Sequence, residues 1–449
     1  MRGQNMHTPR IRWAAALAGA ALLTAVSACG SSDSSDSSSG GSGEKVTLTY
    51  RLWDEQQKVG YEKVMAAFEK ANPNIDVTVE MLPWDQYWTK ITADAVAGTA
   101  PDVFWMQTSY FPEFVTKGVL ADLSPLKLDT GKYHKTVVDA YTYQGKLYGV
   151  PKDWGIVGLL YNKDAFKKAG VEMPEKLTWA PDGSGTLLET ARKLTVDEAG
   201  KHPDEPGFDA GKVKQYGFGS WNHYQTQWMN WVESNGGKLV DKNFGRYTFN
   251  DDASVQALQF GVDLVNKYHV APPASQTNLP TGKMTEMFER GEVAMFPANN
   301  ALLPFIAPEI NFEIGIAMMP EGPKGRSVNL NGLSEAVYAK TKHPAEANKL
   351  AAFLGSPEAQ KIMADGGYVF PALVEFGQNY VDYWKNSKKL DVSPFLEESK
   401  GTTYGMPVVT GFPGYEPKLV QIFNEMYLGR ITPKQAADQA VQEGNASIG

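Results

Sequence analysis

The amino-acid sequence predicts an α/β protein with two lobes. Three observations point to this fold class. The 449 residues exceed what one hydrophobic core usually serves. From Val46 onward, strand-like alternation and helix-like spacing of apolar residues follow one another. Within residues 145–164, an apolar strand pattern is interrupted at Pro151, which is typical of a strand that leaves one sheet and enters another.

The chain begins with a pattern typical of a secretory signal. Arg2, Arg10 and Arg12 precede an uncharged run that ends at Ala28. A short positive region followed by a short apolar region predicts a signal peptide over residues 1–28. The run is too short to be a comfortable membrane span.

Small residues lead into Cys29, the only cysteine of the chain. The segment Val26-Ser-Ala-Cys29 resembles a bacterial lipobox, which implies cleavage before Cys29 and lipidation of its thiol. The alternative is an incidental or buried cysteine. Residues 30–43 are nearly all Ser, Gly and Asp, so we expect residues 29–43 to be a lipidated cysteine and a flexible tether.

The next segment predicts a βαβαβ unit. Its strands are expected at 46–52, 75–81 and 103–106, and its helices near 61–68 and 84–95. In open α/β sheets, ligands bind beyond the carboxyl ends of the strands. That rule points to Trp53 and Asp54 after the first strand and to residues 107–110 after the third.

The interrupted strand at 145–164 is the predicted hinge of the molecule. Lys152, Asp153, Trp154 and Gly155 lie at the interruption, which combines polar groups, an aromatic face and a flexible glycine. We expect further crossings between lobes near residues 328–332 and 367–371. Between these segments, Trp221 and Asn222 precede a helix and are free to face a ligand.

Helical spacing also predicts which tryptophans are structural. Trp84, Trp88 and Trp231 recur with other apolar residues at helical intervals, so we expect them in the core.

The composition disfavours several other functions. The formal net charge of −8 disfavours nucleic acid or anionic lipid as the main partner. The six histidines show no metal-ligand spacing, so we expect no metal ion and no cofactor. Signatures for a serine hydrolase, a phosphate loop or a dinucleotide site are missing from the sequence. A glycosidase carboxylate pair stays open at this point.

Several motifs in order resemble the extracellular solute-binding proteins of bacterial carbohydrate ABC importers, a group that includes maltodextrin-binding proteins. The motifs are Phe68-Glu-x-x-Asn-Pro-x-Ile75, Gly98-Thr-Ala-Pro-Asp102, Leu147-Tyr-Gly-Val-Pro151, Tyr161-Asn-Lys-Asp164, Gly291-Glu-Val-Ala-Met295 and Ser356-Pro-Glu-Ala-Gln360. The resemblance implies a type II periplasmic-binding-protein-like fold, with a ligand cleft between lobes joined by three crossing segments. It implies an N-terminal lobe of 44–152 and 331–369 and a C-terminal lobe of 153–330 and 370–449.

The resemblance also implies a set of substrate-binding residues, because aromatic rings stack on sugars while amides and carboxylates bind hydroxyls. By position in the family these are Trp53, Asp54, Trp105, Gln107, Asp153, Trp154, Asn299, Asn331, Tyr368 and Phe412. Trp221 and Asn222 are added from the pattern of residues alone.

The implied function is that of a receptor and not an enzyme. We expect a monomer, lipid-anchored through Cys29 at the extracellular face of the membrane, that binds an oligosaccharide and delivers it to the permease subunits of an ABC importer. One alternative is a receptor for another polar solute, such as a polyol or glycerol phosphate. A secreted glycosidase is the alternative from a different class.

Overall fold

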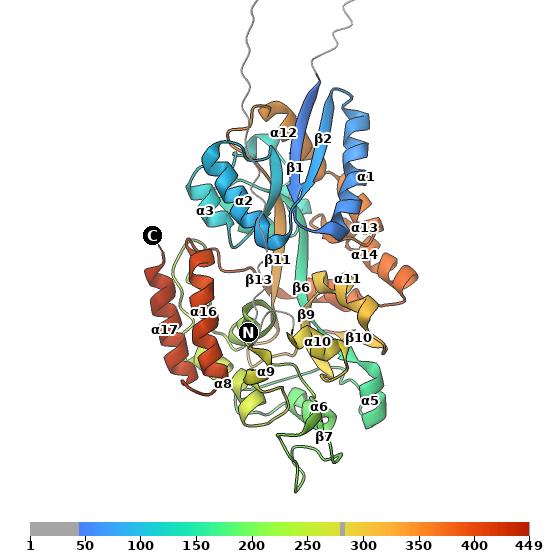
Figure 1. Cartoon of the computed structure of the whole chain (residues 1–449), viewed down its shortest axis with the longest axis vertical. Helices are drawn as coiled ribbons and strands as arrows, with labels where there is room; N and C mark the ends of the chain where they lie inside the picture. The colour runs from blue at the N-terminus through green and yellow to red at the C-terminus, as the bar shows by residue number, and fades with distance from the viewer. Residues whose placement is uncertain (1–44, 279–282, 449) are drawn as a thin grey trace, which may run out of the picture. The chain divides into compact units, whose positions relative to one another are not determined.

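The structure, a computed structural model, describes residues 45–278 and 283–448. The predicted signal peptide, Cys29 and the predicted tether lie outside the described residues. From Glu44 onward the chain forms one compact unit in which strands and helices alternate (Figure 1). The α/β class predicted from the sequence is therefore confirmed.

The elements have the following bounds. The strands are β1 (Val46–Leu52), β2 (Ile75–Met81), β3 (Val103–Gln107), β4 (Thr142–Tyr143), β5 (Lys146–Leu147), β6 (Val150–Asn162), β7 (Val196–Asp197), β8 (Val213–Gln215), β9 (Met295–Asn299), β10 (Ile314–Ala317), β11 (Ser327–Val337), β12 (Phe370–Pro371) and β13 (Thr402–Tyr404). The α-helices are α1 (Glu55–Ala71), α2 (Trp84–Ala97), α3 (Phe111–Thr116), α4 (Lys135–Ala140), α5 (Lys163–Ala169), α6 (Thr186–Leu194), α7 (Met229–Ser234), α8 (Asp252–Asn266), α9 (Ala274–Thr277), α10 (Lys283–Glu289), α11 (Leu303–Ile306), α12 (Pro344–Leu354), α13 (Pro357–Asp365), α14 (Gly377–Tyr383), α15 (Ser393–Ser399), α16 (Phe412–Tyr427) and α17 (Pro433–Ala446).

The first three strands and two helices form the predicted βαβαβ unit. Strand β1 lies between β2 and β3 and pairs with both in parallel. Helix α1 begins at the carboxyl end of β1, where the Asp54 side chain accepts hydrogen bonds from the backbone N–H groups of Gln56 and Gln57. This N-cap satisfies two of the free donors of the first helical turn and directs the chain away from the sheet edge.

Strand β6 connects two parts of the sheet. Its first half pairs with β11, and its second half pairs with β9 and β10 (Figure 1). The predicted interruption at Pro151 is not a break, because β6 continues from Val150 to Asn162. The register against β11 instead shifts there, since Leu333 pairs with Asp153 and Ser334 with Pro151. Lys152 is thus the extra residue of a β-bulge, a distortion that re-aims side chains.

The three predicted crossing segments lie side by side. Residues 330–333 of β11 pair with 153–156 of β6, and Phe370 of β12 pairs with Trp154. Strand β11 also continues into pairing with β3, so the parallel strands and the antiparallel strands share two long elements. The polar groups at the middle of β6 and β11 therefore lie where the two parts of the sheet meet.

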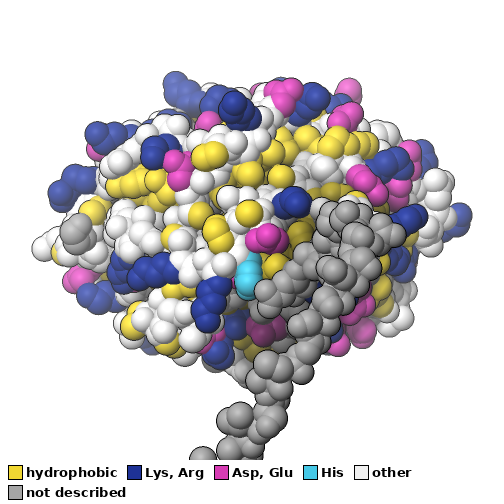
Figure 2. Space-filling model, turned by 90° about the horizontal axis from the view of Figure 1, so that it is seen from above, with side chains coloured by type: hydrophobic (Ala, Val, Ile, Leu, Met, Phe, Trp, Pro, Cys, Tyr) yellow, Lys and Arg dark blue, Asp and Glu magenta, His cyan; other side chains and the backbone are white. Residues whose placement is uncertain are grey.

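One face of the molecule can be described from its side chains. On the face shown in Figure 2, basic and acidic side chains are interspersed among apolar ones. Among the described residues, no helix combines the length and apolar character that crossing a membrane requires.

Candidate functional site

A cavity of about 800 Å³ lies where the two parts of the sheet meet. Its walls come from the loop between β1 and α1, the end of β3, the middle of β6 and β11, the segment after β9, and residues 366–388. Its size is in the range of small-molecule sites in proteins.

Most of the predicted site residues line this cavity. They are Trp53, Asp54, Gln107, Asp153, Trp154, Asn299, Asn331 and Tyr368. Each lies at or just after the end of a strand or on a crossing segment, so the topology brings together residues that are distant in sequence. Their contact with a ligand stays a prediction.

Four predicted residues do not line the cavity. Trp105 lies inside β3 and not at its end, and it is fully buried, with its indole Nε1 donating to the Tyr50 hydroxyl. The Trp221 ring stacks on Phe296 at 5.5 Å. The remaining two pack in or against α16: the Asn222 amide donates to the carbonyl of Val420 and the side chain of Asn424, and Phe412 is buried at the start of that helix.

Of the three tryptophans expected in the core, Trp88 and Trp231 are buried as predicted. The expectation for Trp84 is wrong, because its side chain is 41% exposed and lines the cavity. Helix α2 begins at this residue, so Trp84 lies at the end of the helix and its position in the helical pattern does not bury it. The predicted helix limits near 84–95 already put Trp84 at the first position, and this end position is the signal that could have separated it from the buried stripe.

Other lining residues were not predicted. Phe305 is 49% exposed and comes from the short helix α11. The remaining unpredicted aromatic and polar side chains of the lining are Tyr380, Tyr383, Trp384, Phe370, Gln56, Gln57, Gln225, Asn300 and Lys388. Nothing in the local sequence pattern distinguishes these residues from others of their type, because their placement depends on contacts made elsewhere in the fold.

The aromatic residues of the cavity differ in how much surface they offer. Trp53 contacts Trp84 edge to face, with ring centres 5.2 Å apart. Trp154 is only 4% exposed, and its ring stacks on Phe370 at 4.3 Å with 14° between the planes. Trp84 and Phe305 are therefore the most exposed aromatic residues of the lining, and little of Trp154 is left for a ligand.

Glycines make room for two of the lining side chains. A Cβ at Gly155 would come within 2.5 Å of the Asn299 side-chain oxygen. Gly367 has φ of +66°, and a Cβ there would meet the Tyr383 ring at 1.9 Å. These positions require glycine because the lining side chains pack directly against the backbone.

The asparagines at the cavity are held by their oxygens. Asn331 Oδ1 accepts from the Thr108 hydroxyl, and Asn299 Oδ1 accepts from the N–H of Ala301 at 2.9 Å. Their Nδ2 groups have no hydrogen-bond partner among the residues that the structure describes. These two amides can therefore donate to an acceptor in the cavity.

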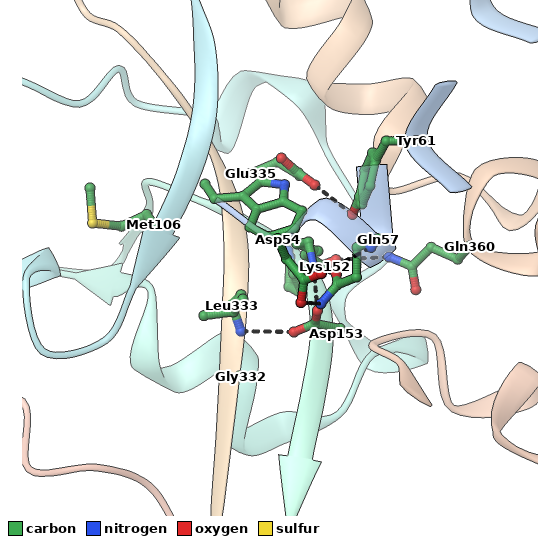
Figure 3. A network of polar contacts seen from close by, with 12 residues as sticks. Asp54, Gln57, Tyr61, Met106, Lys152, Asp153, Gly332, Leu333, Glu335 and Gln360 are labelled. Carbon is green, nitrogen blue, oxygen red and sulfur yellow. Dashed lines mark hydrogen bonds and ion pairs between the residues drawn. The ribbon is translucent and has the colours of Figure 1, made fainter. Parts of the chain in front are cut away.

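A network of polar contacts connects Asp54, Gln57 and Asp153 of the cavity lining (Figure 3). Gln57 Nε2 donates to Asp54 Oδ2 at 3.1 Å, and Gln57 Oε1 accepts from Lys152 Nζ at 2.8 Å. Lys152 also forms an ion pair with Asp153, whose other oxygen accepts from the Leu333 N–H at 3.3 Å. These contacts join the start of α1 to β6 and β11.

The carboxyl group of Glu335 is buried next to these polar contacts. Glu335 accepts hydrogen bonds from the hydroxyls of Tyr50 and Tyr61. Burial raises the pKa of Glu335 to about 7, while Lys152 and the two tyrosine hydrogen bonds oppose the rise. The group does not line the cavity.

The described residues contain no group of three or more His, Cys, Asp or Glu side chains placed to hold a metal ion. The cavity lining combines carboxylates, amide donors and exposed aromatic rings. Such a combination binds a ligand with many hydroxyls and apolar faces.

The sequence of this chain is similar to those of known proteins. The model of the family described as "Bacterial extracellular solute-binding protein" matches residues 53–361. The chain is 28% identical to the arabinooligosaccharide-binding protein of Bacillus subtilis, over 71% of both chains. It is 25% identical to the diacetylchitobiose binding protein DasA of Streptomyces coelicolor, over 97% of this chain and 98% of that one.

Solved structures share the fold. The crystal structure of UspC from M. tuberculosis matches with a TM-score of 0.78 and 32% identity, over 90% of this chain and all of that one. The fold is the two-lobed one of maltodextrin-binding-protein-like periplasmic binding proteins, as predicted. The chain belongs to the family of bacterial extracellular solute-binding proteins.

Proposed function

We propose that this protein is the receptor of an ABC importer, which binds an oligosaccharide outside the cell and delivers it to the permease. Family membership and relatives named for arabinooligosaccharide and diacetylchitobiose binding support this proposal. The observation that carries it is the cavity itself, which combines exposed Trp84 and Phe305 with the free amides of Asn299 and Asn331. Aromatic faces suit the C–H faces of sugar rings, and amides suit their oxygens.

The charges of the cavity favour a neutral ligand. Asp54 caps α1, and its carboxylate is stabilised by two backbone N–H groups and the positive end of the helix. Asp153 has Lys152 as its counter-charge. Both carboxylates are therefore compensated by the protein and can accept hydrogen bonds from hydroxyls. A phosphate ester would call for arginines, but Lys388 is the one cationic side chain among the described residues that line the cavity.

We also propose that the protein carries out no reaction on its ligand. A glycosidase needs one protonated carboxyl group and one carboxylate flanking the bond that breaks. Asp54 and Asp153 are instead each engaged by donors from the protein.

A thermal-shift panel tests the binding proposal. The soluble chain, starting at residue 44, is melted with mono- and oligosaccharides, polyols and glycerol phosphate. A specific ligand at about 100 times its dissociation constant should stabilise the fold by about 2.7 kcal/mol. The proposal fails if glycerol phosphate alone raises the melting temperature, or if no sugar does. Recovery of the sugar unchanged after prolonged incubation separates a receptor from a glycosidase.

We further propose the cellular arrangement that the sequence predicts. Cleavage before Cys29 and lipidation of its thiol would hold the monomeric protein at the outer face of the membrane, with residues 29–43 as a tether. The lobes would comprise 44–152 with 331–369 and 153–330 with 370–449. Strand pairing at residues 153–156, 330–333 and 370 supports these limits, because all three crossings meet there.

A further inference from the structure

We propose that Lys152, which does not line the cavity, is a positioning residue that orients Gln57 and Asp153 of the cavity lining and makes the site selective for neutral ligands. Only the binding measurements that test this proposal depend on the proposed function. Lys152 is the extra residue of the β-bulge in β6, and its side chain is 1% exposed. Its ammonium group contacts Asp153 and Gln57 and lies 3.9 Å from the centre of the Trp105 ring.

The ammonium group determines which way the Gln57 amide faces. An ammonium can only donate hydrogen bonds, so the neighbouring end of the Gln57 amide must be its oxygen. The Nε2 end is then directed to Asp54, where it donates at 3.1 Å. Lys152 therefore orients Gln57, which adds one donor to the Asp54 carboxylate that already caps α1, and it contacts Asp153 directly (Figure 3).

Lys152 is in turn held by its surroundings. The Trp105 ring lies against its charge, a cation–π contact in a site from which water is largely excluded. The Tyr61 ring centre is 5.4 Å from Nζ. Trp105, which does not line the cavity, therefore acts on the site through its contact with Lys152.

The same contacts set the charge of the cavity. Asp54 is compensated by the N-terminus of α1, and Asp153 is compensated only by Lys152 among the ion pairs of the described residues. Without Lys152, Asp153 would be a carboxylate with 9% exposure and no counter-charge. A cationic ligand could then supply the missing charge, so selectivity between neutral and cationic sugars depends on Lys152.

The test compares Lys152→Met with Arg51→Met in the full chain. Arg51 is a matched control because it is also a buried cation in the first part of the sheet, paired with Asp94, whose side chain is 9% exposed like that of Asp153. Both variants remove a buried cation and should lower the melting temperature. A Lys152→Met/Asp153→Asn variant restores charge balance and guards against failure of the single variant to fold.

The probes are cellobiose and its 2-amino counterpart, the glucosamine disaccharide, which are similar in size and differ in charge. Calorimetry should show the ratio of their affinities shifting toward the cationic sugar by about tenfold or more in Lys152→Met. The ratio should stay within about twofold of the wild type in Arg51→Met. An unchanged ratio in Lys152→Met, or an equal shift in Arg51→Met, would overturn the proposal.

Ligand-free crystal structures decide the positioning role even if neither disaccharide binds. The Gln57 amide should leave its contact with Asp54 or reverse its ends in both Lys152 variants, and should not move in Arg51→Met. If Gln57 and Asp153 keep their wild-type positions, Lys152 does not position them. Failure of every sugar in the thermal-shift panel would instead overturn the proposed function and leave this structural result standing.

Discussion

Trp84→Ala should weaken ligand binding more than it weakens the fold. A tryptophan side chain can bury up to about 250 Å², and 41% of Trp84 is exposed, which leaves about 100 Å² for a ligand to cover. At about 25 cal/mol per Å², full coverage is worth about 2.5 kcal/mol, or about 70-fold in affinity. Coverage of half that area gives about eightfold. Isothermal calorimetry with the sugar identified by the thermal-shift panel measures the loss.

The control is Trp231→Ala. Trp231 is buried against Trp179 and Phe260 and does not line the cavity. Its removal should cost roughly 3–5 kcal/mol of stability without ligand, while affinity measured well below the melting temperature stays near that of the wild type. The reasoning is refuted if Trp84→Ala keeps full affinity, or if both variants lose affinity in proportion to their loss of stability.

Three other outcomes follow from the structure and the sequence. Gly155→Ala should cost roughly 1 kcal/mol of binding by displacing Asn299, whereas Gly414→Ala, where a Cβ has open space, should not change calorimetric affinity. Glu335→Gln should remove one contribution to the pH dependence of the free energy of unfolding. The folded chain holds the Glu335 proton up to about 7 while the unfolded chain releases it near its usual value of 4.5, so stability falls as pH rises between these values. Denaturant titrations at pH 5 and 8 should therefore show the variant gaining on the wild type at the higher pH, and a constant difference would contradict the raised pKa. Cys29→Ala should release the protein from membranes or leave its signal uncleaved, whereas unmodified Cys29 in membrane-extracted wild type, seen by mass spectrometry, would rule out the anchor.

The strand-end rule predicted much of the cavity. Trp53 and Asp54 follow β1, and Gln107 ends β3, so the order of elements was enough to place them at one edge of the sheet. Asp153 and Trp154 were found because polar residues interrupt an apolar strand. These signals are local, which is why a single sequence carries them.

The remaining errors have physical causes. Periodicity cannot separate the first residue of a helix from its interior, so Trp84 was assigned to the core. Trp105 lies two residues before the end of β3, and this small difference in position buries it completely. The contact between Gln57 and Lys152 joins two elements that are distant in sequence, and no local sequence pattern predicts it.

The pairing of β6 with β11 also constrains when the protein can fold. Strands β1 and β3 are synthesised early. Strand β3, however, pairs with β11, and Ile156 of β6 pairs with Leu330 of β11, which is synthesised much later. Closing such long loops costs conformational entropy before the new contacts can compensate for it, and this cost slows folding. The sheet therefore cannot be completed until most of the chain has been made.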